Sequence, residues 1–289
     1  QREGPCMLVE LLTRGGKRDL VVPYFAFRRL LSRKDDAELF GKIAKLRYEV
    51  YCLECNYIDH AEFEDGLEAD RFDERSIHMA AQTHDGELVG TVRFVLASPD
   101  QDFPFEEHCS IFPDFKFPPR QECGEVSRLI VKKSFRRRPG DSVQGVSKEF
   151  REKGSLETIG PQTKTITGKN RRTNSPLIML GMYRETYRYC RQHGIRYCYV
   201  AMEKGMANLC DRMGIHFTPV GPETDYYGPV TTYMLDFREI EVQMGAANKF
   251  MSAWFRDEHI SDWLFVSTLF KFTFTRIRAA LKRRTKASS

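Results

Sequence analysis

Apolar residues in the first half of the chain recur first at the spacing of a helix and then at the spacing of strands. The helical pattern opens at 35–36 and places five apolar side chains on one face: Leu39, Ile43, Leu46, Val50 and Leu53. Two apolar runs, 77–83 and 88–97, flank an Asp-Gly pair at 85–86, which is typical of a β-hairpin. The segment EVSRLIVK at 125–132 is rich in β-branched residues and predicts a further strand.

The second half of the chain alternates between the same two patterns. Ser175 and Pro176 provide an N-cap and a first-turn proline for a long helix that ends at Gly194. Three strands and one short helix are expected beyond it: strands at 197–202, 215–220 and 231–237, and a helix at 206–213. The order is helix, hairpin, strand, helix, strand, helix, strands, which predicts a mixed α/β sheet rather than a strictly alternating parallel one.

These patterns divide the chain into three parts. We expect an N-terminal arm at 1–34, one α/β domain at 35–237, and a helical tail at 238–289. Within the domain, 134–174 is a polar, Gly-rich insert with ten basic and four acidic residues. A loop of this length in a compact domain is usually functional or disordered.

Composition narrows the class of protein. With 41% hydrophobic and 29% charged residues in a chain of 289, the protein is globular rather than disordered. The net charge of +5 is unevenly spread: 54–74 holds nine acidic residues and one basic, and 271–286 holds seven basic and no acidic. This pattern indicates two specialised surfaces. It does not favour a nucleic-acid-binding protein, since the basic tail lacks a recognised nucleic-acid-binding motif.

The cysteines favour a reduced setting without metal. Eight are scattered along the chain, and the lone CxxC pair Cys52 and Cys55 lacks the further ligands of a zinc site. We therefore expect no metal centre and a cytoplasmic location.

The tail combines aromatic and basic residues, but it has no apolar run of the ~18 residues that a spanning helix needs. Five apolar residues of 261–281 can share one helix face, with basic residues beside them: Trp263, Phe270, Phe274, Ile277 and Leu281. Two interpretations stay open. The helix lies on the inner membrane surface as a peripheral contact, or it packs on the domain or at a dimer interface.

Charged residues in four short segments are candidates for chemistry. Taken singly, each segment has an ordinary explanation: a helix face, a solvated acidic loop or a structural salt bridge. The candidates are Arg47, Tyr51 and Tyr57; Glu68, Asp70 and Asp73; Arg93; and Glu125, Ser127 and Arg128. Strand alternation puts Glu125 and Ser127 on one face and Arg128 on the other, beside Val126. Charges within a β-branched strand need partners when buried, so function is at least as well supported there as structure.

In this order and spacing the four segments resemble the acyl-homoserine lactone (autoinducer) synthase family, relatives of the GNAT superfamily. That family carries an arginine and two aromatic residues on its first helix, an E-x-D-x-x-D loop, an arginine in the next hairpin and an E-x-S-R strand. The likeness covers about residues 35–220. Tyr51 and Tyr57 stand where those synthases usually have Phe and Trp. The insert, the tail and the segment PLIMLGMYRETYRYCRQHGI look more like the N-acyl amino acid synthases and the acyltransferases associated with bacterial PEP-CTERM/exosortase systems.

The resemblance implies a fold and a reaction. The fold is a GNAT-like, mixed and mostly antiparallel sheet with splayed central strands, flanked by helices, plus a C-terminal helical extension. The reaction moves a fatty acyl group from a phosphopantetheine thioester, on acyl carrier protein or coenzyme A, to the amine of an amino acid or similar small acceptor. No bound cofactor is implied. Glu125 would accept the amine's proton beside Ser127 and Arg128, and backbone N–H groups at the splay would stabilise the oxyanion.

The resemblance also implies binding roles. Arg47 would bind the acceptor's carboxylate or order its helix, while Asp70 and Asp73 would position the amine or brace the neighbouring arginines. Tyr51, Tyr57, Glu68 and Arg93 complete the expected acceptor site. Because carrier proteins are acidic, a basic docking face is expected at the pantetheine entry: Arg136, Arg137, Arg138, Lys169, Arg171 and Arg172. The GNAT pattern R/Q-x-x-G-x-G/A is only echoed, by RRRPGD at 136–141.

Two other functions remain open at this point. The protein could make acyl-homoserine lactones from S-adenosylmethionine, or it could be a non-catalytic acyl-carrier or lipid-binding module that keeps the fold. The products formed by the protein distinguish the three readings.

Overall fold

The computed structural model describes residues 19, 21–22, 24–136, 175–212 and 215–268. The strands are β1 (Ala26–Leu30), β2 (Ser76–Gln82), β3 (Leu88–Leu96), β4 (Cys123–Val131), β5 (Tyr197–Met202), β6 (Thr218–Asp225) and β7 (Pro229–Asp236). The longer helices are α2 (Ala37–Tyr48), α6 (Ser175–Gln192), α7 (Lys204–Arg212), α8 (Phe237–Ala247) and α9 (Lys249–Arg256), and α3 (Pro104–His108) is a single turn.

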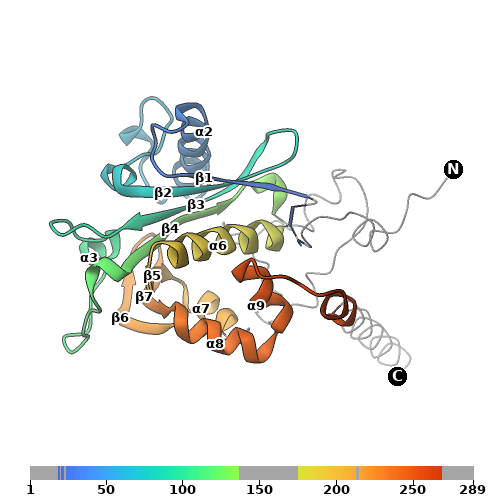
Figure 1. The fold of residues 1–289 in the computed structure, drawn as a ribbon. Coiled ribbons are helices and arrows are strands. Elements are labelled where there is room, and N and C mark those ends of the chain that lie inside the picture. Colours follow the sequence, from blue (N-terminus) through green and yellow to red (C-terminus); the bar gives the residue numbers. More distant parts are fainter. Residues whose placement is uncertain (1–18, 20, 23, 137–174, 213–214, 269–289) are drawn as a thin grey trace, which may run out of the picture.

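Seven strands form one sheet in the order β1-β2-β3-β4-β5-β7-β6 (Figure 1). Every neighbouring pair is antiparallel except β4 and β5, which run parallel at the centre. Their pairing joins Cys123–Val126 to Tyr197–Val200 and stops there, although both strands continue. The mixed, mostly antiparallel sheet with splayed central strands is therefore confirmed.

Most of the expected elements form where their patterns lie. The hairpin and the strand at 197–202 are present, and Asp36 caps α2 by accepting a hydrogen bond from the Leu39 N–H at 2.9 Å. Gly194 ends the long helix with a φ of +70°, a conformation that glycine adopts without strain.

Several boundaries differ from the prediction, and for two of them the structure shows the cause. The helix does not continue regularly to residue 53, because a π-helical segment, Glu49–Glu54, follows α2 and changes the angular phase of the side chains. Leu53 is consequently 56% exposed instead of facing the core. The strand expected at 215–220 begins at Thr218, since the Ile215 N–H still bonds the Cys210 carbonyl at the end of α7.

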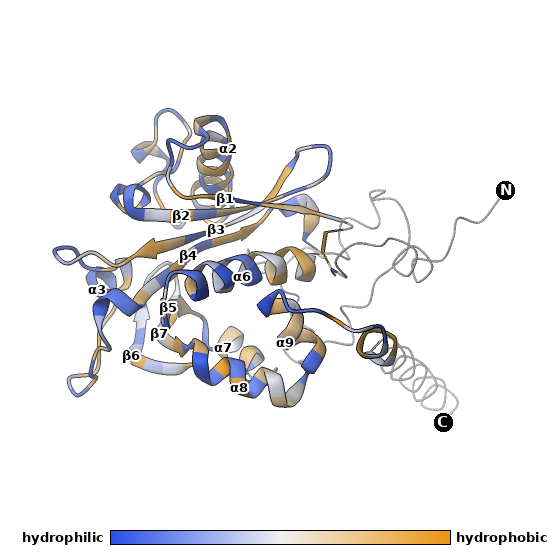
Figure 2. Ribbon diagram, viewed as in Figure 1, coloured by the Kyte–Doolittle hydropathy of each residue, from blue (hydrophilic) through white to orange (hydrophobic). Residues whose placement is uncertain are grey.

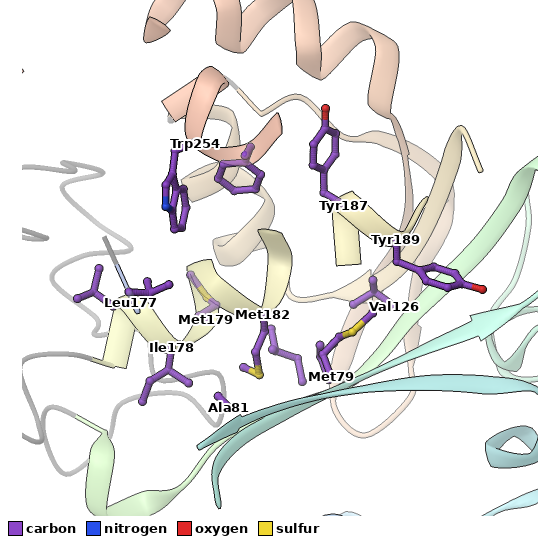
Figure 3. Close-up of a cluster of buried hydrophobic side chains, with 14 of the residues drawn as sticks. Met79, Ala81, Val126, Leu177, Ile178, Met179, Met182, Tyr187, Tyr189 and Trp254 are labelled. Carbon is purple, nitrogen blue, oxygen red and sulfur yellow. The ribbon is translucent and has the colours of Figure 1, made fainter. Parts of the chain in front are cut away.

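Helix α6 covers one face of the sheet and carries the main core. Its ribbon alternates between apolar and polar segments, as an amphipathic helix does (Figure 2). Ile178 and Met182 point from the helix toward the sheet (Figure 3). The helix lies so close to β3 that a Cβ on Gly90 would sit 2.8 Å from Ile178, which explains the glycine at that position.

The chain after the sheet packs back onto α6. Trp254 of α9 is 2% exposed and lies on the side of α6 away from the sheet (Figure 3). Arg188 of α6 donates to the carbonyls of Trp254 and Phe255, which holds the end of α9 in place. Trp263, by contrast, is 80% exposed.

The tail prediction is tested only in part of its length. Of the helix face proposed for membrane contact, Trp263 is described, and its other members fall in 269–289, outside the described residues. Peripheral membrane contact therefore stays a prediction. Among the described residues, no helix combines the length and apolarity needed to cross a bilayer.

Candidate active site

A cleft opens where β4 and β5 part. Its volume is about 410 Å³. Its lining includes Glu125–Leu129 of β4, residues 200–202 of β5 with Glu203 directly after them, residues 226–230 at the β6–β7 turn, and side chains of the segment after α2. Six of the residues predicted from the sequence line it: Tyr51, Tyr57, Glu125, Ser127, Arg128 and Arg136. The other described candidates lie behind this wall: Arg47, Glu68, Asp70, Asp73 and Arg93.

Arg47 lies at the bottom of a buried charge network. It is fully buried, with 0% exposure, although its helix pattern alone suggested an ordinary surface arginine. Its guanidinium donates to Glu68 and, at 2.7 Å, to Asp73. The acidic segment that supplies these carboxylates turns tightly at Asp70, whose side chain and that of Asp73 cap each other's backbone. The turn thus brings both carboxylates over α2.

Two more arginines close the network from the sheet. Arg93 donates to Asp70 at 2.5 Å, to Asp73 at 3.1 Å and to the Ser127 hydroxyl at 2.9 Å. Arg128 contacts Glu68 at 3.0 Å and Asp70 at 3.4 Å. Three arginines are therefore balanced by three carboxylates. Asp70 contacts both Arg93 and Arg128, and Asp73 contacts Arg93.

The predicted facing of Arg128 is wrong. A regular strand would turn it away from Ser127, but Arg128 has a φ of +52° and lies in a bulge, where β4 has one residue more than β3 between paired positions. Arg93, which donates to the Ser127 hydroxyl, also contacts Asp70. Because of the bulge, Arg128 reaches the same Asp70 carboxylate and so lies on the side of Ser127. A left-handed non-glycine residue is strained, and strain of this kind concentrates at functional sites.

The network keeps Glu68 and Asp73 ionised. Burial opposes ionisation of Glu68, but Arg47 and Arg128 outweigh it and lower the pKa of Glu68 to about 2. Burial likewise opposes ionisation of Asp73, whose pKa is nevertheless held below its usual range by the arginines. His78, which the sequence reading passed over, lies 3.7 Å from Asp73. Burial lowers the pKa of His78 to about 4, so it is neutral at pH 7.

Glu125 has the opposite environment. It is 1% exposed, and among the buried carboxylates of the described residues it alone has no ion pair. Its Oε2 accepts a hydrogen bond from the Phe105 N–H at 3.1 Å. Burial raises the pKa of Glu125 to about 8, although the Phe105 bond and the more distant positive charges of Arg93 and Arg128 partly oppose this. A carboxyl with a pKa near neutrality can both release and accept a proton.

Four tyrosines surround the Arg128 side of the cleft. The guanidinium of Arg128 lies 5.2 Å from the ring centre of Tyr51 and 5.7 Å from that of Tyr227. Tyr57 stacks on Tyr227 at 5.9 Å, and Tyr226 lies 4.4 Å from Tyr227. The sequence reading missed Tyr226 and Tyr227, although the strand–DYYG–strand pattern could have indicated an aromatic turn.

Arg136 is part of the cleft wall. It is 5% exposed, donates to both oxygens of Glu54 at 2.5 and 2.8 Å, and donates to the Val131 carbonyl at 2.7 Å. Its charge is therefore largely committed within the protein. The other predicted docking residues lie outside the described residues: Arg137, Arg138, Lys169, Arg171 and Arg172. In the described part of the chain, no group of three His, Cys, Asp or Glu side chains could hold a metal ion.

The splayed parallel pair within an otherwise antiparallel sheet, with a cleft at the splay, defines the fold class of the GNAT acyltransferases. Residues 46–144 match the family model described as the acetyltransferase (GNAT) domain. This match spans about a third of the chain, which in that part is similar to the GNAT acetyltransferase domain. A search of curated protein sequences finds no significant match.

Solved structures with this fold include acyl-homoserine lactone synthases. The coenzyme A-dependent synthase BjaI, in complex with SAM and isopentyl-CoA, is 16% identical over 77% of this chain and 89% of its own, with a TM-score of 0.50. TofI, in a ternary complex with an inhibitor and MTA, is 14% identical over 76% and 95%, with a TM-score of 0.51. FeeM, an N-acyl amino acid synthase from uncultured soil microbes, is 13% identical over 76% and 94%, with a TM-score of 0.41. The likeness to BjaI and TofI shows the fold alone.

Proposed function

We propose that this protein is an N-acyltransferase that moves a fatty acyl group from a phosphopantetheine thioester to the amine of an amino acid or a similar small acceptor. The observation that carries the proposal is Glu125, a buried carboxyl at the splay of β4 and β5 that forms no ion pair with any residue in the described part of the chain. The cleft volume of about 410 Å³ falls in the range of small-molecule sites.

In this proposal the proton of the attacking amine passes to Glu125. An ammonium ion has no lone pair, so the amine must be neutral when it attacks the thioester carbonyl. Its nitrogen forms the new amide bond, the carbon–sulfur bond breaks, and the thiolate leaves. Glu125 takes the amine's proton directly or through a water molecule. Backbone N–H groups beyond Val126 and Val200, where β4 and β5 no longer pair with each other, would face the developing oxyanion.

The charge network supports this chemistry from behind the cleft wall. Because Arg47 is fully buried and bound to two carboxylates, of its two proposed roles we retain the ordering of the helix. Arg93 and Arg128 would fix the bulged segment that carries Ser127, and their positive charge would help Glu125 to ionise. Tyr51, Tyr57 and Tyr227 would form the wall that the acceptor meets.

Product analysis tests the proposal. Purified protein is incubated with a long-chain acyl group carried by coenzyme A or by acyl carrier protein, together with the proteinogenic amino acids and S-adenosylmethionine. The products are identified by mass spectrometry. N-acyl amino acids formed by the wild type and largely lost in Glu125→Gln support the proposal. Formation of acyl-homoserine lactone would instead identify S-adenosylmethionine as the acceptor. Binding of donor without any product would indicate a non-catalytic module.

The donor can be tested separately. We propose that acyl carrier protein docks on the basic segment after β4, so Arg137→Glu with Arg138→Glu should weaken use of carrier-bound donor more than of a small pantetheine thioester. Added salt should shrink that difference, because it screens electrostatic docking. Arg136→Glu should impair both donors alike, since it breaks a buried pair with Glu54. If Arg137→Glu with Arg138→Glu weakens the use of both donors equally and independently of salt, the result would argue against docking of acyl carrier protein on this segment.

A further inference from the structure

Arg120 cross-links several parts of the segment between β3 and β4. It follows the short excursion that contains α3, and its guanidinium reaches back across that excursion. It donates to the carbonyls of Ser98 at 2.9 Å and Gln101 at 2.5 Å. It also forms a two-oxygen ion pair with Glu106, at 3.1 and 2.9 Å. One side chain therefore ties the start of the excursion to α3.

The clamped helix is the one that contacts Glu125. Glu106 accepts the Phe103 N–H at 2.7 Å, which fixes the first turn of α3. Two residues later the Phe105 N–H donates to Glu125. The guanidinium of Arg120 also lies 4.7 Å from the ring centre of Phe103. The path from Arg120 to Glu125 is thus one ion pair, one turn of helix and one hydrogen bond.

The same turn keeps water from the Glu125 carboxyl. Phe103 and Phe105 are 1% and 0% exposed, and their rings stack at 6.0 Å. Both rings pack on Tyr199 of β5, at 5.8 and 4.6 Å, and Tyr199 is the residue paired with Glu125 in the sheet. These three rings form an apolar cover beside the carboxyl, and the cover depends on the position of α3.

We infer that Arg120 is a positioning residue for Glu125: it holds α3 so that Phe105 presents its N–H to the carboxyl while the aromatic cover excludes water. The inference rests on the proposed function, in which Glu125 is the proton acceptor. Arg120 itself would touch neither donor nor acceptor, because it is absent from the cleft lining.

The expected effect of losing Arg120 follows from the environment of Glu125. Loss of the Phe105 hydrogen bond would raise the pKa, and entry of water would lower it; burial is the larger influence, so the pKa should fall. Of the other titratable and charged groups that act on Glu125, those outside α3 stay in place: Arg75, Arg93, Arg128, Cys198 and Tyr226. Glu106 and Cys109 move with α3.

Infrared spectroscopy can measure this without catalysis. The difference between wild type and Glu125→Gln isolates the band of the protonated Glu125 carboxyl, and its loss with rising pH gives the titration midpoint. We expect the midpoint in Arg120→Met to fall by about one pH unit or more from the wild-type value. The matched control is Arg196→Met. Arg196 is also 31% exposed and also forms a two-oxygen pair, with Asp236, but it is not linked to α3.

Arg120→Lys provides a second test if Arg120→Met does not fold. It keeps the positive charge and leaves Glu106 unchanged, but it loses the two-oxygen pair with Glu106 and the bonds to the carbonyls, so its midpoint should move in the same direction. An unchanged or raised midpoint in the folded variants overturns the inference, because the carboxyl would then remain dry without the clamp. If the wild type transfers no acyl group and yet the midpoint falls, the proposed function fails while the positioning of Glu125 stands.

Discussion

Replacing Glu125 by glutamine should change the pH dependence of acyl transfer as well as its rate. The substitution keeps the size of the side chain and removes its ability to accept a proton. Loss of a general base typically costs about 10²- to 10⁴-fold in rate. The structure adds a more specific expectation, because burial raises the pKa of Glu125 to about 8.

The magnitude follows from that pKa. Only about one-tenth of Glu125 is ionised at pH 7 and about one-hundredth at pH 6, if the pKa is about 8. The kcat/KM of the wild type divided by that of Glu125→Gln should therefore rise about tenfold per pH unit from pH 6 to 7 and level off above pH 8. The ratio is the useful quantity, because the acceptor amine's own titration affects both proteins alike and cancels.

The assay measures the amide product by mass spectrometry at fixed donor and low acceptor concentration, from pH 4 to 9. A ratio that stays constant over this range would refute Glu125 as the base. An inflection near the ordinary glutamate pKa of 4.5 would show that the carboxyl is ionised throughout and that its burial has no catalytic effect.

Stability provides an independent check on the same group. The folded protein holds the proton of Glu125 more tightly than the unfolded chain, so its favourable contribution is present below pH 4.5 and is lost as pH rises toward 8. Glu125→Gln cannot titrate. The variant should thus gain stability relative to wild type between pH 5 and 8, by at most about 1.4 kcal/mol per pH unit. Urea unfolding at several pH values measures this, and a difference independent of pH would contradict the raised pKa.

Two further predictions concern stability, measured by urea unfolding. Trp254→Ala should cost about 3–5 kcal/mol because the ring is 2% exposed in the core, whereas Trp263→Ala, at 80% exposure, should change little; similar values for both would mean that the tail does not pack as described. Glu68→Gln should cost about 3–5 kcal/mol by leaving two buried arginines without their shared carboxylate. Glu38→Gln, which breaks an exposed pair, should cost under about 1 kcal/mol, and a comparable loss in both would refute the buried network.

The sequence predicted local structure well wherever one local signal decided it. The Asp-Gly turn, the Asp36 cap and the glycine after α6 each depend on a few neighbouring residues, and each lies where expected. The prediction failed where the backbone departs from the regular period of a helix or a strand. The π-helical turn after α2 and the left-handed bulge at Arg128 each shift the phase of the side chains that follow, and a periodic reading assumes a constant phase.

Residues of the candidate site were easier to select than to place. The charged residues were recognisable as a set, because charges inside apolar segments need partners. Which charges pair is a property of the sheet and of the turn at Asp70, so the complete burial of Arg47 did not follow from its helix. The aromatic turn at Tyr226 and Tyr227 enters the cleft only because β6 and β7 lie beside β5.

Glu68 and Glu125 show why a role cannot be read from residue type. Both are buried glutamates of the same motif set, at 0% and 1% exposure. Glu68 contacts two arginines, and its pKa falls to about 2; Glu125 accepts one backbone hydrogen bond, from Phe105, and burial raises its pKa to about 8. Pushing similar groups in opposite directions is how one site separates a permanent charge from a proton carrier. Glu68 therefore contributes a fixed charge to the network behind the wall, whereas the raised pKa of Glu125 suits the proton exchange that the proposed function requires.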